Sequence, residues 1–397
     1  MKFERACIPL GCAWSSPFVR WQGSLAEVSS MDLAVHVTRD ALAARGIEPK
    51  TLTQLVMGFT VPQNDSFYAA PWTAARIGAE GISGPVVMQA CATSVAALVA
   101  AAAAVESDTG ENVLVVTTDR TSNGPLMIYP GASGMGGSPQ VEHWVLDNFA
   151  ADPWTGEAMI ATAENVARAG GLSREALDDL TMLRYEQYLS TLANDRAIQH
   201  RYLQAVVLPG KKGASKEIAT DEGIHPYSRE NLRSLRPAVA NGTTTFGSQT
   251  HPADGCAGAI VCNQAEARRQ SKGEGVVRLI GARYARAEKG YMPKAATMAA
   301  QRVVADAGIS FDQIRAVVTH NPFAVNDAWF CQQTGYPAER MNQYGCSLIY
   351  GHPQGPTGMR GIAELIETLR QAGGGIGLFT GCAAGDTGGA LLLSVEP

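Results

Sequence analysis

The sequence predicts an α/β protein built from two similar halves with a third lobe inserted between them. Three observations indicate this class: short apolar runs alternate with helical patterns, one helix, glycine and strand pattern occurs twice, and the middle of the chain differs in character from both ends. The chain has 397 residues and 46% hydrophobic content, so it can bury a large core. This length indicates two or three packed domains.

The first element that carries chemistry is the segment around Cys91. The apolar run 84–88 predicts a buried strand, and the alanine-rich stretch 95–105 predicts a buried helix. Cys91 lies between them, at the helix N-terminus, where the partial positive charge of the helix end favours a thiolate and stabilises an oxyanion. The residue is therefore a candidate nucleophile. The alternative is a small buried apolar residue, which is the commoner role of a lone cysteine.

The internal repeat gives Cys91 a partner. Segments 41–57 and 303–319 each show a helix, a glycine stop and a strand. Cys91 lies 45 residues after the glycine of the first copy, and His352 lies 44 residues after the glycine of the second copy. We therefore expect both residues at equivalent strand-to-helix turns, which a pseudo-twofold axis brings together.

The inserted lobe covers residues 120–236. It opens with a glycine-rich and aromatic loop at 129–154 and continues through helical patterns at 158–169 and 174–199. Long loops are often functional, so three aromatic side chains of this loop either cover an apolar substrate or pack locally: Trp144, Phe149 and Trp154.

The second half carries the densest polar cluster of the chain. His320 and Asn321 follow a predicted strand at 316–318, and Cys382 follows another at 377–380. Each histidine alone is more often a hydrogen-bonded structural residue than a catalyst. Their placement is informative because four residues fall at expected carboxyl ends of strands or in the turns beyond: Cys91, His320, His352 and Cys382.

Composition excludes several classes of protein. The net charge is −5 with Lys and Arg scattered, so we expect no nucleic-acid partner. The eight cysteines show neither metal-ligand spacing nor a disulfide pattern, so we expect no metal site and a cytoplasmic location. The longest apolar run, Val95 to Val105, is too short to span a membrane, and the first residues lack the apolar core of a signal peptide.

At this point the residues resemble a known family, the thiolases, which are acyl-CoA acyltransferases of the thiolase and ketosynthase superfamily. The resemblance covers most of the chain. It is carried by the Gly351-His352-Pro353 block with its following glycines, by the preceding Asn342 and Gly345, and by Cys382 at the position of the family's second reactive cysteine. Five further stretches also match: Thr162 to Ala167, Ser173 to Glu175 with Asp178, Leu235 to Pro237, Gly242-Thr243, and Asp254-Gly255.

The resemblance implies a fold, which is a five-layered αβαβα arrangement of two duplicated halves with a loop domain. It divides the chain into a first half at 1–119 that returns at 237–268, a loop domain at 120–236, and a second half at 269–397. It also implies assembly as a homodimer or tetramer. Coenzyme A is then a substrate, and no tightly bound cofactor is expected.

The resemblance assigns roles residue by residue. Cys91 is implied to be the acylated nucleophile, His352 the base that activates it, and Cys382 the acid and base for the second partner. These roles agree with general chemistry, because a cysteine paired with a histidine is a common activated nucleophile. A thioester on Cys91 predicts ping-pong kinetics.

The chain departs from the commonest thiolases around the substrate. The usual Asn-Glu-Ala-Phe is replaced by residues 320–323, His-Asn-Pro-Phe, which is similar to the His-Asp-Cys-Phe pattern of sterol-carrier-protein-type thiolases. We expect His320 and His352 to face the thioester oxygen of the substrate, His320 directly or through a water. Further candidates for the oxyanion sites or the pocket are Asn321, the backbone N–H of Ala384, and Met159, for which core packing is the alternative.

The candidate contacts to coenzyme A are weaker. Residues 248–251 replace the usual Asn-Ala-Ser-Gly, so the candidates for substrate or coenzyme A contacts are Ser248, Thr250, His251 and Phe323. Three cations in the lobe either meet phosphates or are solvated surface charge: Lys211, Lys212 and Arg229.

The predicted function is thiolysis of a 3-oxoacyl-CoA or the reverse Claisen condensation, on a specialised branched or aromatic substrate such as benzoylsuccinyl-CoA. A small zinc-binding OB-fold partner subunit is also predicted, because some similar thiolases work with one. Three alternatives stay open: a type III ketosynthase-like condensing enzyme, which has no use for Cys382, a cysteine hydrolase, and a non-catalytic thiolase-like subunit of a complex.

Overall fold

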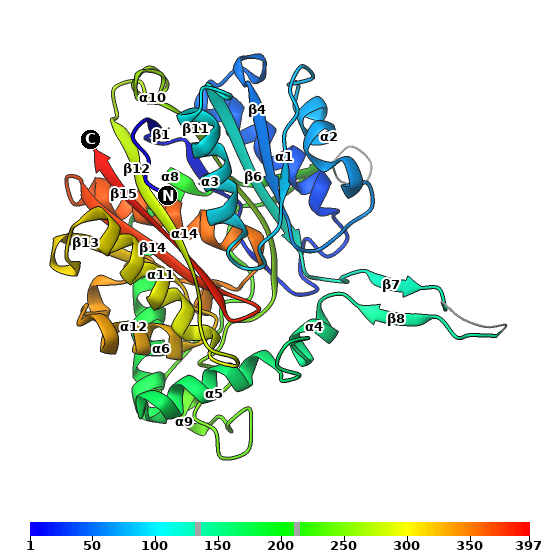
Figure 1. Ribbon diagram of the computed structural model, residues 1–397, viewed down its shortest axis with the longest axis vertical. Coiled ribbons are helices and arrows are strands. Elements are labelled where there is room, and N and C mark those ends of the chain that lie inside the picture. The colour runs from blue at the N-terminus through cyan, green and yellow to red at the C-terminus, as the bar shows by residue number, and fades with distance from the viewer. Residues whose placement is uncertain (132–135, 210–214) are drawn as a thin grey trace.

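The computed structural model describes residues 1–131, 136–209 and 215–397. Lys211 and Lys212, two of the predicted phosphate contacts, lie outside the described residues. Figure 1 shows a body of sheets and helices from which one two-stranded arm projects.

The two halves of the body share one continuous path of strands. The order is β13-β14-β15-β12-β1-β11-β6-β4-β5, and β2 and β3 also pair with β11. The halves join where β1 pairs with β12, with Ile8 opposite Val277. The first-half strands are β1 (Ala6–Pro9), β2 (Ala13–Ser15), β3 (Val19–Arg20), β4 (Gln54–Gly58), β5 (Val86–Val87), β6 (Asn112–Arg120) and β11 (Ala253–Asn263). The second-half strands are β12 (Val276–Arg286), β13 (Ile314–His320), β14 (Gly375–Ala383) and β15 (Thr387–Glu396).

Helices form three layers around these strands. One outer layer packs on the first half, the central layer lies between the halves, and the other outer layer packs on the second half. These helices are α1 (Ser30–Arg45) and α2 (Ala69–Arg76), then α3 (Thr93–Glu106) and α14 (Gly355–Gln371), then α11 (Met292–Ala307) and α12 (Ala324–Thr334). Two short helices, α10 (Gln264–Gln270) and α13 (Ser347–Tyr350), complete the body. The predicted five-layered αβαβα arrangement is confirmed.

The two central helices are buried, α3 because of its apolar composition and α14 with its charged side chains paired. Helix α3 is rich in alanine and valine on all sides, and residues 355–369 of α14 are all buried. Small residues let the two helices approach closely: Ser94 Oγ donates to the carbonyl of Gly355 at 2.5 Å, and a Cβ at Gly358 would lie 2.9 Å from the Cβ of Ser94. This close packing brings the two helix N-termini together.

The helix, glycine and strand repeat is present in both halves. Helix α1 ends at Gly46 with φ of 65°, and α11 ends at Gly308 with φ of 70°. Both glycines adopt the left-handed conformation that a non-glycine residue adopts only at a cost. Strands β4 and β13 follow at equivalent positions, as the repeat predicts.

The inserted lobe packs on the second half and holds most of the remaining elements. A buried ion pair joins the two parts: Arg184 Nε lies 2.8 Å from Asp327 Oδ2, and both side chains are fully buried. Strands β7 and β8 form the projecting arm (Figure 1). The elements are β7 (Leu126–Tyr129), β8 (Gln140–His143), α4 (Leu146–Ala150), α5 (Met159–Gly170), α6 (Arg174–Thr191), α7 (Ala193–Arg196), α8 (Gln199–Tyr202), β9 (Val206–Pro209), β10 (Ser215–Ile218) and α9 (Arg229–Ser234).

Three local expectations were wrong. The strand expected at 84–88 is only Val86–Val87, because its single neighbour β4 ends at Gly58, the partner of Val87. Cys382 lies inside β14 and not after it, because pairing with β15 extends the strand to Ala383. The turn before His352 follows the short helix α13 and not a strand.

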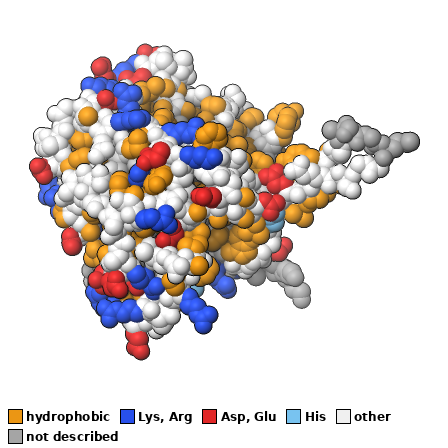
Figure 2. Space-filling model, turned by 60° about the horizontal axis from the view of Figure 1, so that its bottom comes forward, with side chains coloured by type: hydrophobic (Ala, Val, Ile, Leu, Met, Phe, Trp, Pro, Cys, Tyr) orange, Lys and Arg blue, Asp and Glu red, His pale blue; other side chains and the backbone are white. Residues whose placement is uncertain are grey.

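The surface agrees with the charge pattern of the sequence. Figure 2 shows Lys and Arg scattered over one face, with hydrophobic side chains gathered around the base of the arm. Within the described ranges, no helix has the length and apolar character needed to cross a membrane. The eight cysteines, all of them in these ranges, are free thiols.

Candidate active site

Cys91 lies in a tight turn between β5 and α3. Ala90 has φ of 42°, a left-handed conformation that costs a non-glycine residue about 1–3 kcal/mol. The side chain of Thr93 holds the turn, since its Oγ1 accepts from the N–H of Gln89 at 2.9 Å and donates to the carbonyl of Ala90 at 2.7 Å. The turn therefore fixes the sulfur just before the first residue of the helix, Thr93.

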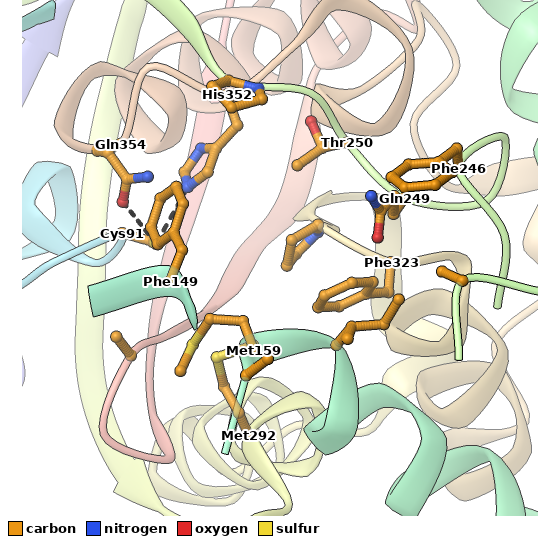
Figure 3. Close-up of a pocket in the computed structure, with 16 residues that line it drawn as sticks. Cys91, Phe149, Met159, Phe246, Gln249, Thr250, Met292, Phe323, His352 and Gln354 are labelled. Carbon is orange, nitrogen blue, oxygen red and sulfur yellow. Dashed lines mark hydrogen bonds between the residues drawn. The ribbon is translucent and has the colours of Figure 1, made fainter. Parts of the chain in front are cut away.

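The sulfur of Cys91 has two polar partners from the second half. His352 Nε2 lies 3.0 Å from it, and Gln354 Oε1 accepts from the thiol at 3.2 Å (Figure 3). The other ring nitrogen of His352 lies 2.6 Å from Thr357 Oγ1, which fixes the orientation of the ring. A thiol has only one hydrogen, so at any one time the sulfur donates either to Gln354 Oε1 or to His352 Nε2.

The electrostatics of this pair indicate a neutral resting state. Burial raises the pKa of the Cys91 thiol to about 12, although backbone N–H groups of Ala384 and of Cys91 itself act in the opposite direction. Burial, together with the neighbouring His320, lowers the pKa of His352 well below its ordinary value. At rest the proton therefore stays on the sulfur, with the neutral imidazole of His352 beside it as a base that can receive it.

His320 lies behind His352, at the end of β13. The two imidazole rings stack with centroids 4.1 Å apart, and His320 Nδ1 lies 2.9 Å from Ser347 Oγ. The Nε2 atom of His320 is buried and has no hydrogen-bond partner in the described part of the chain. Burial lowers the pKa of His320 to about 3, so the ring is neutral. An oxygen of a bound substrate would give this nitrogen its missing partner.

The ligand atoms of Cys91, His320 and His352 lie within 4.8 Å of one another, as they would in a metal site. The angle of 27° between the stacked ring planes argues against one, because two nearly parallel rings cannot both aim a nitrogen lone pair at one ion. N–H groups of the two rings can still donate to one substrate oxygen, because hydrogen bonds tolerate larger departures from ideal angles than metal coordination does.

Cys382 is fully buried beside this group. Asn326 Nδ2 donates to its sulfur at 3.2 Å. Burial raises the pKa of the Cys382 thiol, and the nearby Cys91 raises it further. The second cysteine is therefore a protonated thiol at rest, which can act as an acid.

A cavity of about 340 Å³ opens above Cys91 (Figure 3). Among the predicted residues, those that line it are Cys91, His352, Ala384, Met159, Thr250 and Phe323. Its other walls are largely apolar and come from the inserted lobe, from segment 238–252 and from the second half: Phe149, Ala158, Ile160, Ala238, Phe246, Gln249, Pro252, Met292, Pro322 and Gln354. The aromatic loop contributes only Phe149, since Trp144 Nε1 donates to the carbonyl of Thr60 at 2.8 Å and Trp154 is 57% exposed.

Six of the predicted site residues do not line the cavity, and two of them are His320 and Cys382, which are buried beside it. Asn321 is buried below it, where its amide donates to Asp327 Oδ2 at 2.8 Å. Ser248 is buried and bonds to Thr245. The remaining two also lie outside the lining: His251 is mostly buried with its pKa lowered to about 4 by desolvation, and the exposed Arg229 pairs with Asp179 at a separate surface hollow.

Two functional residues were missed in the sequence. Gln354 contacts the Cys91 sulfur. The sequence feature that could have identified it is a polar residue inside the block that contains His352. Asp119 is buried beneath the site, where its carboxylate accepts the N–H of Gly355 at 2.8 Å and the N–H of Thr60 at 2.7 Å. Burial raises the pKa of Asp119 to about 7. This carboxylate links the start of α14 to the first half. Its hydrogen-bond partners lie far from it in the sequence, so the sequence alone does not show this role.

Two family models together match most of the chain. The thiolase N-terminal domain matches residues 12–265, and the thiolase C-terminal domain matches residues 274–395. Acetyl-CoA acetyltransferase IA of Candida tropicalis is 26% identical, with 96% of this chain and 95% of that protein covered. The 3-oxoadipyl-CoA/3-oxo-5,6-dehydrosuberyl-CoA thiolase of Escherichia coli is also 26% identical, over 95% of this chain and 96% of that protein.

Solved structures show the same fold. Human mitochondrial 3-ketoacyl-CoA thiolase in complex with CoA superposes with a TM-score of 0.89 at 22% identity, over 100% of this chain and 99% of that chain. The Bacillus anthracis acetyl-CoA acetyltransferase superposes with a TM-score of 0.90 at 21% identity, over 99% of each chain. The two matched domains together span most of the sequence. The chain therefore belongs to the thiolase family of acyltransferases.

Proposed function

We propose that this chain cleaves a 3-oxoacyl-CoA with coenzyme A through a thioester on Cys91, or runs the reverse Claisen condensation. The observation that carries the proposal is the 3.0 Å contact between Cys91 Sγ and His352 Nε2 at the floor of a 340 Å³ cavity. A cysteine and a base held in this way form an activated nucleophile.

The first half-reaction forms the acyl-enzyme. His352 Nε2 takes the thiol proton as the Cys91 sulfur bonds to the 3-oxo carbon of the substrate. The bond between carbons 2 and 3 then breaks, and its electron pair stays on carbon 2 as the enolate of the departing acyl-CoA. The Cys382 thiol gives its proton to carbon 2 and becomes a thiolate.

The second half-reaction regenerates the enzyme. The Cys382 thiolate takes the proton of the coenzyme A thiol, whose sulfur attacks the acyl carbon on Cys91. The tetrahedral intermediate expels the Cys91 thiolate, which regains its proton from the His352 imidazolium. The products are two acyl-CoA molecules. The proton of the coenzyme A thiol replaces the one that Cys382 gave to carbon 2, and Cys91 and His352 return to their starting protonation states.

Two groups of donors stabilise the oxyanions of these steps. Backbone N–H groups of Cys91 and Ala384 already act on the Cys91 sulfur, so they are well placed for the oxygen on the acyl carbon. The unpartnered Nε2 of His320 and the protonated Nε2 of His352 serve the enolate oxygen, His320 directly or through a water.

The cavity supports a bulky acyl group. Its walls include large apolar side chains from three parts of the chain, which would cover a branched or aromatic group better than an acetyl group: Phe149, Met159, Phe246, Met292 and Phe323. Benzoylsuccinyl-CoA is one such substrate. The name of the related E. coli protein also gives substrates longer than acetoacetyl-CoA.

The proposal includes assembly with other subunits. Strand β5 lies at the end of the strand order, and Val86 and the neighbouring Met88 are 42% and 60% exposed, which supports pairing with a second copy in a homodimer or tetramer. The small zinc-binding OB-fold partner stays a prediction. Light scattering of the purified chain tests for the homo-oligomer. Co-purification from cells that also express a small zinc-binding OB-fold protein tests for the partner subunit.

The main experiment is a panel of 3-oxoacyl-CoA substrates, including acetoacetyl-CoA and benzoylsuccinyl-CoA, assayed for coenzyme A dependent loss. Intact-protein mass should show one acyl group, absent in Cys91→Ala and retained in Cys331→Ala, a matched cysteine variant outside the site. Free acid released without coenzyme A would indicate a hydrolase, and condensation onto acyl carrier protein without thiolysis would indicate a ketosynthase. No acylation by any acyl-CoA would indicate a non-catalytic subunit and contradict the proposal.

A further inference from the structure

Gln354 occupies an unfavourable backbone conformation at the active site. Its φ and ψ are 61° and −104°, a combination that favours glycine and strains a residue with a side chain. The residue lies two positions after His352 and directly before α14. Strain of this kind persists only where the surrounding structure holds the residue in place, and it is common at active sites.

Only one of the two polar atoms of the Gln354 side-chain amide has a hydrogen-bond partner among the described residues. Its Oε1 accepts the Cys91 thiol at 3.2 Å, whereas its Nε2 is buried and bonds to no described residue. The residue is 6% exposed and lines the cavity. An amide N–H group left unpaired in such a place is rare in native proteins, and a bound ligand is one common explanation.

Acylation of Cys91 removes the one partner that this amide has. Once the sulfur bonds to an acyl carbon, the thiol hydrogen is on His352, and Gln354 Oε1 loses its donor. Both ends of a buried amide are then unpaired unless the acyl group supplies a partner, which is unfavourable. A hydroxyl group offers both a donor for Oε1 and an acceptor for Nε2.

We propose that Gln354 is a specificity-determining residue that selects acyl groups with a hydrogen-bonding oxygen close to the thioester. Because Oε1 lies 3.2 Å from the sulfur, the amide reaches an oxygen one or two carbons beyond the acyl carbonyl. The acyl group therefore combines an apolar body, which fits the cavity walls, with one oxygen near the reacting carbon. This inference rests on the proposed thiolase function.

Gln249 provides a matched contrast. It also lines the cavity, but it lies on the opposite side from Cys91, beside Phe246 and Phe323 (Figure 3). Its backbone forms an isolated bridge with Phe323. A change at Gln249 removes an amide from the same cavity without touching the group that contacts the sulfur.

The test compares two substrates that differ by one isosteric group. 3-Oxohexanoyl-CoA transfers a butanoyl group to Cys91, and 5-hydroxy-3-oxopentanoyl-CoA transfers the equivalent group with hydroxyl in place of the terminal methyl. We expect the wild-type chain to prefer the hydroxyl substrate by about tenfold in kcat/KM. Gln354→Leu should abolish or reverse this preference, because a hydroxyl group without a partner is unfavourable in an apolar cavity. Gln249→Leu should keep it.

A second variant guards against misfolding. Gln354→Gly removes the amide and also relieves the strained backbone, so it should raise the melting temperature while losing the preference for the hydroxyl substrate. Equal use of the two substrates by the wild-type chain, or an unchanged preference in both Gln354 variants, would overturn the inference. Turnover of neither substrate nor of any other 3-oxoacyl-CoA would instead overturn the proposed function, so the two failures are distinguishable.

Discussion

The imidazole ring of His320 stacks on that of His352, with centroids 4.1 Å apart and 27° between the ring planes. Both rings are buried, and each is fixed by a hydroxyl group on its outer nitrogen, Ser347 for His320 and Thr357 for His352. A positive charge on one ring disfavours a charge on the other. Only one ring at a time therefore becomes a charged imidazolium, which suits the proposed site, where His352 accepts the thiol proton and His320 stays neutral and donates through its N–H.

Replacement of His320 tests its role as a donor. His320→Leu keeps much of the side-chain volume but removes both ring nitrogens, so the enolate oxygen loses a donor. We expect kcat to fall about 10²–10³-fold, the usual effect of removing one oxyanion donor. The rate at which iodoacetamide alkylates Cys91 should stay within a few-fold of the wild-type rate. A variant with unchanged thiolysis would contradict the assignment.

Cys382 can be tested separately from Cys91. In deuterated water, the wild-type chain should exchange protons at carbon 2 of acetyl-CoA, since the second cysteine carries protons to and from that carbon. Cys382→Ala should slow this exchange by about 10²–10⁴-fold. Acylation of Cys91 by acetyl-CoA, read by intact mass, should persist in the same variant. Exchange at the wild-type rate would show that another group moves the proton.

The charge state of the nucleophile sets a pH profile. Because burial raises the pKa of Cys91 to about 12, the thiolate fraction grows with pH over the whole neutral range. The alkylation rate should therefore rise about tenfold per pH unit from pH 7 to 10. Peptide mapping and the Cys91→Ala variant identify the labelled residue. A plateau below pH 8 would reveal a thiolate and imidazolium pair at rest.

The buried histidines make stability depend on pH. His320 has a pKa of about 3 in the folded chain and an ordinary value when unfolded, so only the unfolded state takes up its proton between pH 6.5 and 3. Stability is lost as the pH falls through this window. The buried Asp119, with its pKa raised to about 7, titrates in the opposite sense, so a variant must isolate the histidine.

We therefore compare wild type with His320→Asn by urea unfolding. Between pH 7.5 and 5.5 the wild-type chain should lose about 1.4 kcal/mol more unfolding free energy than the variant. His200→Gln, at an exposed histidine, serves as the control and should follow the wild type. If the unfolding free energies of wild type and His320→Asn changed equally with pH, His320 would take up its proton in the folded state too.

The buried ion pair between the lobe and the second half should matter for stability. Arg184→Met leaves the buried carboxylate of Asp327 without its cation, so we expect a loss of about 3–5 kcal/mol in unfolding free energy. The matched change Arg229→Met breaks the exposed pair with Asp179 and should cost less than about 1 kcal/mol. Similar urea midpoints for the two variants would contradict the difference in burial.

Patterns that repeat along the chain were predictable. The nearly equal spacings of 45 and 44 residues from each helix-ending glycine to Cys91 and to His352 predicted that the two residues meet, and their side chains lie 3.0 Å apart. The layer order was implied by the family resemblance, and α3, which is apolar on nearly all sides, lies in the central layer as expected for a buried helix. The division of the chain at residues 119, 236 and 268 stays a prediction.

Contacts between distant segments were not predictable. Arg229 was expected near coenzyme A, but a sequence does not show that Asp179 is its partner. Phe246 and Met292 join one cavity wall from separate elements, with no shared motif to reveal them. Strand ends were missed for a similar reason, since the length of β14 depends on its pairing with β15.

The catalytic pair has a consequence for biosynthesis. Cys91 and His352 are 261 residues apart in the chain, so the nucleophile leaves the ribosome long before its base is made. The carboxylate of Asp119 likewise accepts its hydrogen bond from the N–H of Gly355 only after that residue has been made, 236 residues later. A nascent chain that lacks His352 therefore carries an unassisted thiol, and the proposed acyl transfer begins only after His352 has been made and the two halves have docked.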